Sequence, residues 1–258
     1  MQIFLPVIIV TVIGLIAGLG LALASKFMAV PTDEKQEKIR ECLPGANCGA
    51  CGYSGCDGYA AAVACGEAPP DKCAPGGNSA ANALAELLGV EINSEPKVAF
   101  IACNGSAENT ATKYAYSGLM SCAAANLVQS GPMECKYGCI GFGDCYNSCP
   151  FGAITMQNGR PVICKDICVG CGKCASVCPK SLISIVPKSA TVHVSCANKA
   201  RGVQVAKACK VSCISCQMCT KNCPSGAIEI KDNVAVINYD LCTSCGKCKE
   251  VCKRNVIV

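Results

Sequence analysis

The sequence predicts an α+β protein in which an N-terminal transmembrane helix is followed by a small cysteine-rich domain and two tandem repeated units. Residues 3–24 contain no charged side chain, and this length is close to the roughly 20 apolar residues that cross a bilayer as a helix. Cysteine accounts for 27 of the 258 residues. Residues 149–183 recur 74 positions further along the chain. These three observations fix the order of the parts.

The composition excludes several classes of protein. A hydrophobic content of 51% with only 16% charged residues does not fit a disordered chain. The single histidine, His193, rules out both c-type haem attachment and zinc fingers built from two Cys and two His. Secreted disulfide scaffolds are usually short, and 27 is an odd number. The cysteines therefore indicate metal binding.

Residues 1–25 are expected to form a membrane anchor. Gly14 and Gly18 give the small-residue spacing that lets another membrane helix approach closely. No Lys or Arg precedes the apolar segment, whereas four follow it by position 40, so we expect a single-pass protein of the cell membrane with the rest of the chain in the cytoplasm. A cleaved signal peptide ending near Ala24 is the alternative, but a basic start is absent and the apolar segment is long.

Five further segments follow the anchor. Residues 26–41 form a charged linker, 42–78 a small cysteine-rich domain, and 79–134 a connecting α/β segment with a helix expected at 80–88 and a strand at 98–102. The first repeated unit spans 135–183 and the second 184–258. Each unit has two cysteine-rich segments joined by alternating apolar residues, the pattern of a β-hairpin.

The cysteine spacing of the repeated units is typical of bacterial-type ferredoxins with two [4Fe–4S] clusters. In such units three thiolates of each run bind one cluster and the fourth reaches the other cluster. The second unit is therefore expected to bind one cluster through Cys213, Cys216, Cys219 and Cys252 and another through Cys223, Cys242, Cys245 and Cys248.

The first unit departs from this spacing because Phe142 occupies the place of the middle cysteine. Cys135 is the expected replacement from one turn upstream, and a three-iron cluster or a non-cysteine ligand is the alternative. The expected sets are Cys135, Cys139, Cys145 and Cys178 for one cluster, and Cys149, Cys168, Cys171 and Cys174 for the other.

A separate motif lies nearer the anchor. Glycines separate its cysteines and allow the turns that wrapping a metal requires. The spacing alone indicates a four-thiolate site for an iron–sulfur cluster or for zinc, formed by Cys48, Cys51, Cys56 and Cys73. The total expectation is about five clusters. The seven other cysteines are expected not to be ligands, namely Cys42, Cys65, Cys103, Cys122, Cys164, Cys196 and Cys209.

The positive charge of the C-terminal block does not indicate nucleic-acid binding. Residues 135–258 contain 16 Lys or Arg against six Asp or Glu. Four oxidised tetrathiolate cubes would carry about −8 and balance most of that excess. Neither a dinucleotide-binding glycine motif, a Walker loop nor a catalytic acid–base or nucleophile constellation is present in the sequence. His193 is expected on the surface of a strand.

The order of these motifs resembles the B subunit of the Rnf complex. The resemblance rests on residues 43–52, residues 73–77 and the segment from Cys135 to Cys145, and it spans nearly the whole chain. It implies a [4Fe–4S] cluster at the Cys48–Cys73 motif and electron uptake from soluble ferredoxin. It also implies a complex with other membrane and peripheral subunits that couples electron transfer, usually to NAD, to Na⁺ or H⁺ movement. This chain has two ferredoxin-like units where the shorter bacterial form has one.

Three other functions remain open from the sequence. A membrane-bound polyferredoxin could deliver electrons to a cytochrome or a quinone-like carrier instead of NAD. A zinc-stabilised interaction protein would contain no iron. A cluster-assembly scaffold would hold labile, transferable clusters.

Overall fold

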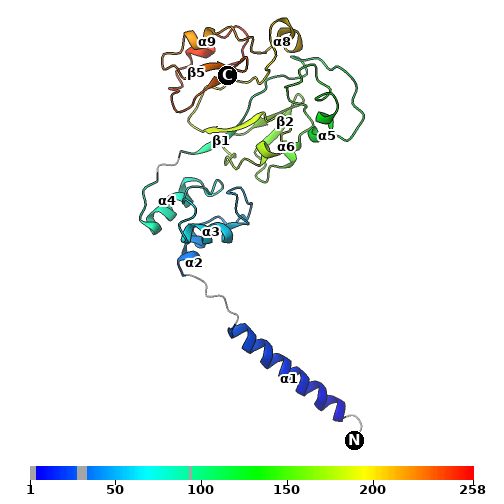
Figure 1. Cartoon of the computed structure of the whole chain (residues 1–258), viewed down its shortest axis with the longest axis vertical. Coiled ribbons are helices and arrows are strands. Elements are labelled where there is room, and N and C mark those ends of the chain that lie inside the picture. Colours follow the sequence, from blue (N-terminus) through cyan, green and yellow to red (C-terminus); the bar gives the residue numbers. More distant parts are fainter. Residues whose placement is uncertain (1–3, 28–33, 93–94) are drawn as a thin grey trace.

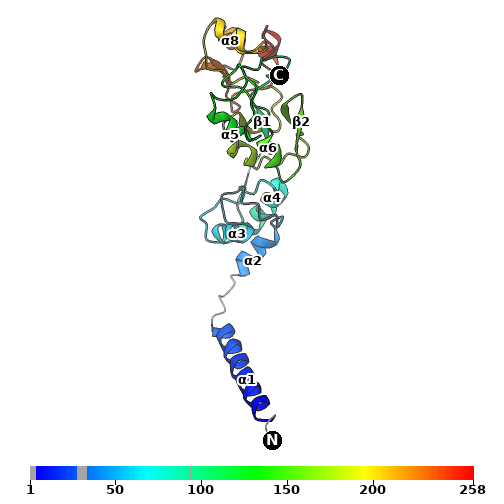
Figure 2. The same cartoon turned by 90° about the vertical axis from the view of Figure 1, so that its right-hand side faces the viewer.

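The computed structural model describes residues 4–27, 34–92 and 95–258. Residues 1–3 of the predicted anchor, 28–33 of the linker and 93–94 of the connecting segment lie outside the described residues. Along the chain, a long helix is followed by a small helical unit and then by a mixed part with helices and strands (Figures 1 and 2). The first two parts contain α1 (Phe4–Phe27), α2 (Glu34–Glu41), α3 (Cys56–Ala64) and α4 (Gly77–Leu88).

Helix α1 coincides with the apolar segment that predicts a membrane anchor. Side chains are described at residues 11–21 and 23 of this helix, and the large apolar ones among them are exposed. Among the described residues, no helix has both the length and the apolar content needed to cross a membrane.

The core of the small helical unit contains Tyr59 of α3, which is buried together with side chains of α2 and α4. The Tyr59 hydroxyl donates to the carbonyl of Pro69 at 2.7 Å and accepts from the backbone N–H of Lys72 at 3.2 Å. Ile39 and Leu84 are fully buried beside it. Helix α4 confirms the helix predicted at 80–88, and it ends at the left-handed Gly89.

The mixed part contains three two-stranded antiparallel sheets and short helices. Its elements are β1 (Lys97–Ile101), α5 (Cys122–Leu127), α6 (Asp144–Asn147), β2 (Ile154–Gln157), β3 (Arg160–Ile163), α7 (Lys173–Ser176), β4 (Ile183–Pro187), α8 (Val203–Ala208), α9 (Met218–Lys221), β5 (Ile228–Lys231), β6 (Val234–Ile237) and α10 (Lys247–Glu250). Hairpins β2–β3 and β5–β6 have the same register, shifted by the repeat length, and both predicted hairpins are confirmed.

The third sheet joins the connecting segment to the end of the first repeated unit, and β4 crosses the predicted boundary between residues 183 and 184. Strand β1 confirms the strand predicted at 98–102, and it pairs with β4 from Lys97 opposite Pro187 to Ile101 opposite Ile183. The apolar pattern of β1 predicts a strand but does not identify the partner. Because β1 pairs with β4, the backbone of β1 lies close to cysteines of the first unit.

His193 does not lie on the surface, so that prediction is wrong. The side chain is buried and stacks on Phe100, with ring centroids 4.4 Å apart, and its Nδ1 lies 2.9 Å from the Tyr239 hydroxyl. Alternation along residues 191–195 predicted an extended segment, but Phe100 of β1 and Tyr239 after β6 cover it from parts of the chain that are remote in sequence. Burial, together with the charge of Lys165, lowers the pKa of His193.

Candidate metal centres

Each ferredoxin-type cysteine run bends into a one-turn helix that directs its third cysteine inwards. Helices α6, α7, α9 and α10 each follow a residue in the left-handed region, with φ of 84°, 78°, 60° and 78°. Glycine occupies three of these positions and adopts this conformation without a Cβ clash. The third cysteines are all buried, namely Cys145, Cys174, Cys219 and Cys248.

Close backbone contacts fix two of these loops in the first unit. A Cβ on Gly141 would lie 2.4 Å from the carbonyl oxygen of Gly159, and one on Gly170 would lie 2.5 Å from that of Lys97. Both residues also have positive φ. Glycine is therefore required at both positions, and Gly170 presses the first turn of its loop against β1.

The second unit gathers its eight cysteines around two cavities. One cavity is lined by Cys213, Cys216, Cys219 and Cys252. The other is lined by Cys223, Cys242, Cys245 and Cys248. In each cavity the fourth thiol comes from the other cysteine run, as the ferredoxin spacing predicts. The geometry thus groups these cysteines as expected, and their role as ligands stays a prediction.

Cys174 is the centre of the corresponding group in the first unit. Burial raises the pKa of Cys174 to about 11, and the nearby thiols of Cys171, Cys168, Cys145 and Cys149 add to this rise. Of these, Cys145 belongs to the other set of the first unit. The backbone N–H of Ala99 in β1 donates to the sulfur of Cys168 at 3.3 Å. The set predicted from spacing is therefore assembled, with a strand of the connecting segment beside it.

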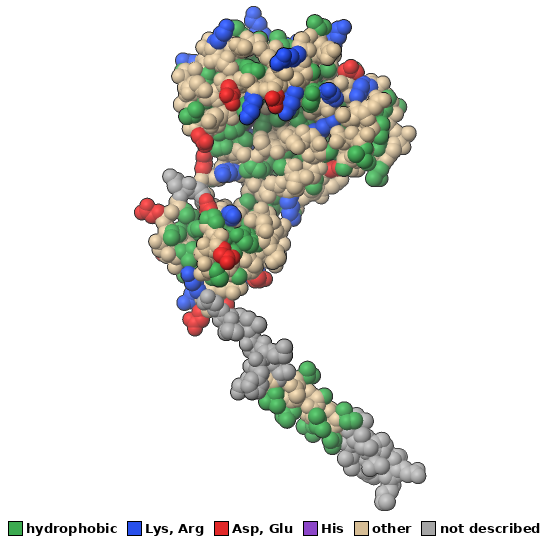
Figure 3. Space-filling model, viewed as in Figure 1, with side chains coloured by type: hydrophobic (Ala, Val, Ile, Leu, Met, Phe, Trp, Pro, Cys, Tyr) green, Lys and Arg blue, Asp and Glu red, His purple; other side chains and the backbone are tan. Residues whose placement is uncertain are grey.

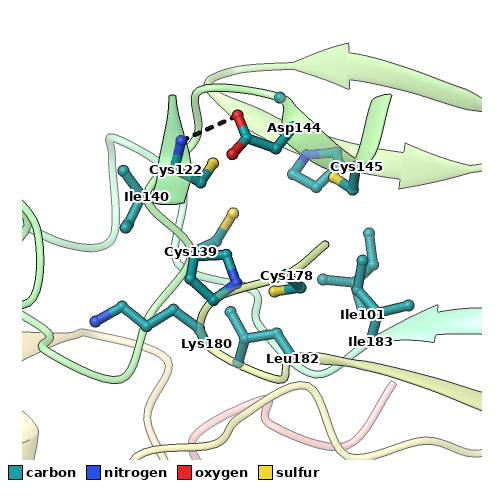
Figure 4. A pocket seen from close by; sticks show the side chains of 13 residues that line it. Ile101, Cys122, Cys139, Ile140, Asp144, Cys145, Cys178, Lys180, Leu182 and Ile183 are labelled. Carbon is teal, nitrogen blue, oxygen red and sulfur yellow. Dashed lines mark hydrogen bonds between the residues drawn. The ribbon is translucent and has the colours of Figure 1, made fainter. Parts of the chain in front are cut away.

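Figure 4 shows the other cavity of the first unit. Its thiols are those of Cys122, Cys139, Cys145 and Cys178, and Ile101, Leu182 and Ile183 contribute apolar wall. Burial raises the pKa of Cys139 to about 12. Four thiols from separate segments therefore converge in a mostly apolar cavity.

Asp144 positions Cys122 in this cavity. Its carboxylate accepts a hydrogen bond from the backbone N–H of Cys122 at 3.0 Å (Figure 4). It also accepts from the backbone N–H of Ala123 at 3.1 Å and from the Ser121 hydroxyl at 2.9 Å. Cys122 is the first residue of α5, so the carboxylate caps that helix. Burial opposes ionisation, but these hydrogen bonds outweigh it and hold the pKa of Asp144 below its usual value.

The structure places Cys135 differently from the sequence-based expectation. Cys135 does not line the cavity of Cys139, Cys145 and Cys178 but a neighbouring one, while Cys122 takes the expected place. The repeat spacing indicates a missing thiol at Phe142, and proximity in sequence favours Cys135 as its replacement. Cys122 is more distant in sequence, and only the folding of α5 against Asp144 brings it there.

The cysteines of the N-terminal motif form a group around Cys73. Burial raises the pKa of Cys73, and the nearby thiols of Cys56, Cys51 and Cys48 raise it further. The Asn47 side chain accepts from the backbone N–H of Cys56 at 2.9 Å, which fixes the loop at the start of α3. The four predicted residues are thus assembled in one place.

The donor sets consist of thiols alone, the ligands that hold [4Fe–4S] clusters in proteins. Within the described residues, no group of three or more Cys, His, Asp or Glu side chains is placed to hold one metal ion. In a [4Fe–4S] cube each thiolate binds a different iron, so the four sulfurs surround a larger object. Buried thiols with raised pKa are poor nucleophiles on their own, whereas a bound metal deprotonates them outright. The site chemistry defines an iron–sulfur protein.

Comparison with known families agrees with this class. Residues 43–75 match a family described as an Fe-S cluster domain, and residues 134–182 and 212–257 each match a 4Fe-4S dicluster domain. The chain is 42% identical to the B subunit of the Na(+)-translocating ferredoxin:NAD(+) oxidoreductase complex of Acetobacterium woodii, over 99% of this chain and 77% of that protein.

Two further relatives extend this comparison. The chain is 42% identical to the B subunit of the proton-translocating ferredoxin:NAD(+) oxidoreductase complex of Clostridium ljungdahlii, over 97% of this chain and 90% of that protein. It is 36% identical to the B subunit of the ion-translocating oxidoreductase complex of Methanosarcina acetivorans, over 97% and 98%. The chain belongs to the family of B subunits of Rnf ion-translocating oxidoreductase complexes.

Proposed function

We propose that this chain is the iron–sulfur subunit of an Rnf-type complex that accepts electrons from reduced ferredoxin and passes them to other subunits. In the complex as a whole this transfer is coupled to Na⁺ or H⁺ translocation and usually to NAD reduction. The observation that carries the proposal is the series of four-thiol groups, two in each repeated unit and one in the helical unit. The relatives divide between Na⁺ and H⁺ in name, so the ion is left as either.

Five sets of residues would hold [4Fe–4S] clusters under this proposal. Four sets are those predicted from spacing, and in the fifth Cys122 replaces Cys135 beside Cys139, Cys145 and Cys178. A bound [4Fe–4S] cube supplies a one-electron couple that needs no substrate bond to be made or broken. The residues of the chain fix the potential of that couple, because backbone N–H donors such as that of Ala99 and apolar walls such as Ile183 surround the sulfurs.

We place the contact with the electron donor on the second repeated unit. Among the cysteines of the five sets, Cys216 and Cys245 are the exposed ones. Ile214 and Leu241, beside these loops, are 45% and 54% exposed. Lys and Arg side chains are spread over this C-terminal part of the surface (Figure 3). An exposed ligand with apolar neighbours lets a redox partner approach a cluster closely.

The anchor and the location belong to the same proposal. The uncharged sequence of residues 3–24, which falls mostly within α1, supports a single membrane-spanning helix. The basic residues that follow it support a cytoplasmic position for the cluster-binding parts, where a soluble ferredoxin could reach them. Since residues 3–24 contain no ionisable side chain, ion passage is assigned to other subunits.

The proposal is tested on the full chain purified without oxygen. Iron and acid-labile sulfide are measured together, and reduced ferredoxin is added stepwise while the paramagnetic signals of reduced clusters are recorded. We expect at least about 20 iron atoms per chain, four for each of five cubes, and reduction by ferredoxin. An iron-poor, colourless protein or one that ferredoxin cannot reduce would contradict the proposal.

A further inference from the structure

Four cysteines outside the five sets meet in a further cavity, which Cys139 of the first unit's set also lines. Cys103 follows β1, Cys135 precedes the loop of Cys139, Cys196 lies before α8, and Cys209 directly follows α8. All four line this cavity, and none forms a disulfide. Cys103, Cys135 and Cys209 are buried. The cavity measures about 20 Å³, as do those of the Cys139 and Cys248 sets, while that of the Cys213 set measures about 200 Å³.

Hydrogen-bond donors are directed at these sulfurs. Cys103 Sγ accepts from the backbone N–H of Gly105 at 3.4 Å and of Cys139 at 3.3 Å. Cys196 Sγ accepts from the N–H of Cys213 at 3.4 Å and of Asn198 at 3.5 Å.

The buried Asn198 side chain also donates to Cys135 Sγ at 3.5 Å. Five donors on three sulfurs stabilise thiolates, which an ordinary apolar core of thiols would not need.

The repeat explains why these thiols are spare. A shift of 74 residues superposes Cys122 on Cys196 and Cys135 on Cys209. In the first unit Phe142 leaves a gap that Cys122 fills. The second unit has Cys216 at that place, so Cys196 is released and faces the shared cavity instead. Of this equivalent pair, Cys122 therefore lines a cavity within the first unit, whereas Cys196 lines the cavity between the two units.

We propose that Cys103, Cys135, Cys196 and Cys209 bind a sixth [4Fe–4S] cluster, located between the two ferredoxin-like units. The proposal rests on the proposed function, because it extends the same series of clusters. The N–H of Cys139, a member of the first unit's set, bonds to Cys103, and that of Cys213, a member of the second unit's set, bonds to Cys196. A cluster here takes one electron from a reduced cube of one unit and gives one to an oxidised cube of the other, with no proton moved.

The test counts intact cubes by ⁵⁷Fe Mössbauer spectroscopy, with iron and zinc analysis, in the full chain prepared without oxygen. The wild type should hold about 24 iron atoms rather than about 20. Cys209→Ala should lose one cube, and Cys135→Ala with Cys209→Ala should lose the same single cube. Cys122→Ala with Cys135→Ala should lose two. The matched control, Cys164→Ala, changes an exposed cysteine outside every set and should lose none.

The outcomes separate this proposal from the proposed function. Five cubes in the wild type and an unchanged count in Cys209→Ala would overturn the sixth site and leave the other five standing. Loss of only one cube in Cys122→Ala with Cys135→Ala would put both residues on one cluster and also overturn it, as would one zinc per chain. A sample with almost no iron would overturn both proposals. If Cys209→Ala does not fold, Cys209→Ser must show an altered Mössbauer signal for one cube.

Discussion

Replacing Asp144 with alanine tests how the chain places Cys122, a residue that the ferredoxin spacing does not include. The carboxylate accepts three hydrogen bonds, two of them from the first backbone N–H groups of α5. Loss of such a cap costs about 0.5–2 kcal/mol. The population in which α5 leaves the cavity should then rise by a factor of between about 2 and about 30.

Asp144→Ala should therefore lose one cluster faster than the wild type when exposed to oxygen or a chelator, by a similar factor. The assay follows iron release and visible absorbance at fixed pH, and amide hydrogen exchange of residues 122–127 reports the detachment of α5. Asp166→Ala is the matched control, because that side chain is 93% exposed and forms a loose ion pair with Lys188 at 3.9 Å. Equal iron release from both variants, with unchanged exchange in α5, would refute the role of Asp144.

Three further predictions follow from the same structure. In thermal unfolding, Gly170→Ala should destabilise the first unit by at least about 1 kcal/mol more than Gly172→Ala. Both glycines have positive φ, but only Gly170 lies against the backbone of Lys97. Equal losses of stability would contradict this steric argument. The pKa of the buried His193 is lowered from its ordinary value of 6.5. The neutral ring therefore stabilises the fold fully above pH 6.5, and this stabilisation is lost as the pH falls from 6.5 towards the pKa of the folded protein. The free energy of unfolding should therefore fall between pH 7 and 5.5 by more in the wild type than in His193→Gln, and parallel pH profiles would count against it. Ile214→Glu should raise the KM for ferredoxin about tenfold, or about 1.4 kcal/mol, with little change in iron content. The control is Leu127→Glu, at a position that is 87% exposed and outside the second unit, and it should leave the KM unchanged. Equal effects of the two substitutions would place the donor contact elsewhere.

Much of the local structure follows from patterns that the chain repeats. The hairpins were predicted because alternating apolar residues lie between two cysteine runs, and Asn158-Gly159 and Asp232-Asn233 adopt the left-handed turns that such hairpins require. Spacing predicts the groupings of Cys213 and Cys223 with their partners, since three cysteines of each set lie within one loop. These features depend on contacts between residues that are near in sequence or related by the repeat.

The exceptions all depend on contacts between remote segments. The expectation that Cys103, Cys122, Cys196 and Cys209 are not ligands stays a prediction. The repeat aligns Cys122 with Cys196, which by itself indicates a shared structural role, and it also aligns Cys135 with Cys209. Only the tertiary structure shows which cavities these cysteines line. No sequence pattern indicates the burial of His193, since Phe100 and Tyr239 come from separate segments.

The amino-acid sequence by itself determined the class of this protein, the order of its parts and the ferredoxin-type cysteine sets. It could do so because a loop of about ten residues wraps three corners of a cube whatever surrounds it. Only the tertiary structure decided that Cys122 joins Cys139 and that Cys135 faces Cys103, Cys196 and Cys209. Those groupings depend on the capping of α5 by Asp144 and the pairing of β1 with β4, and cysteine spacing contains no information about either contact.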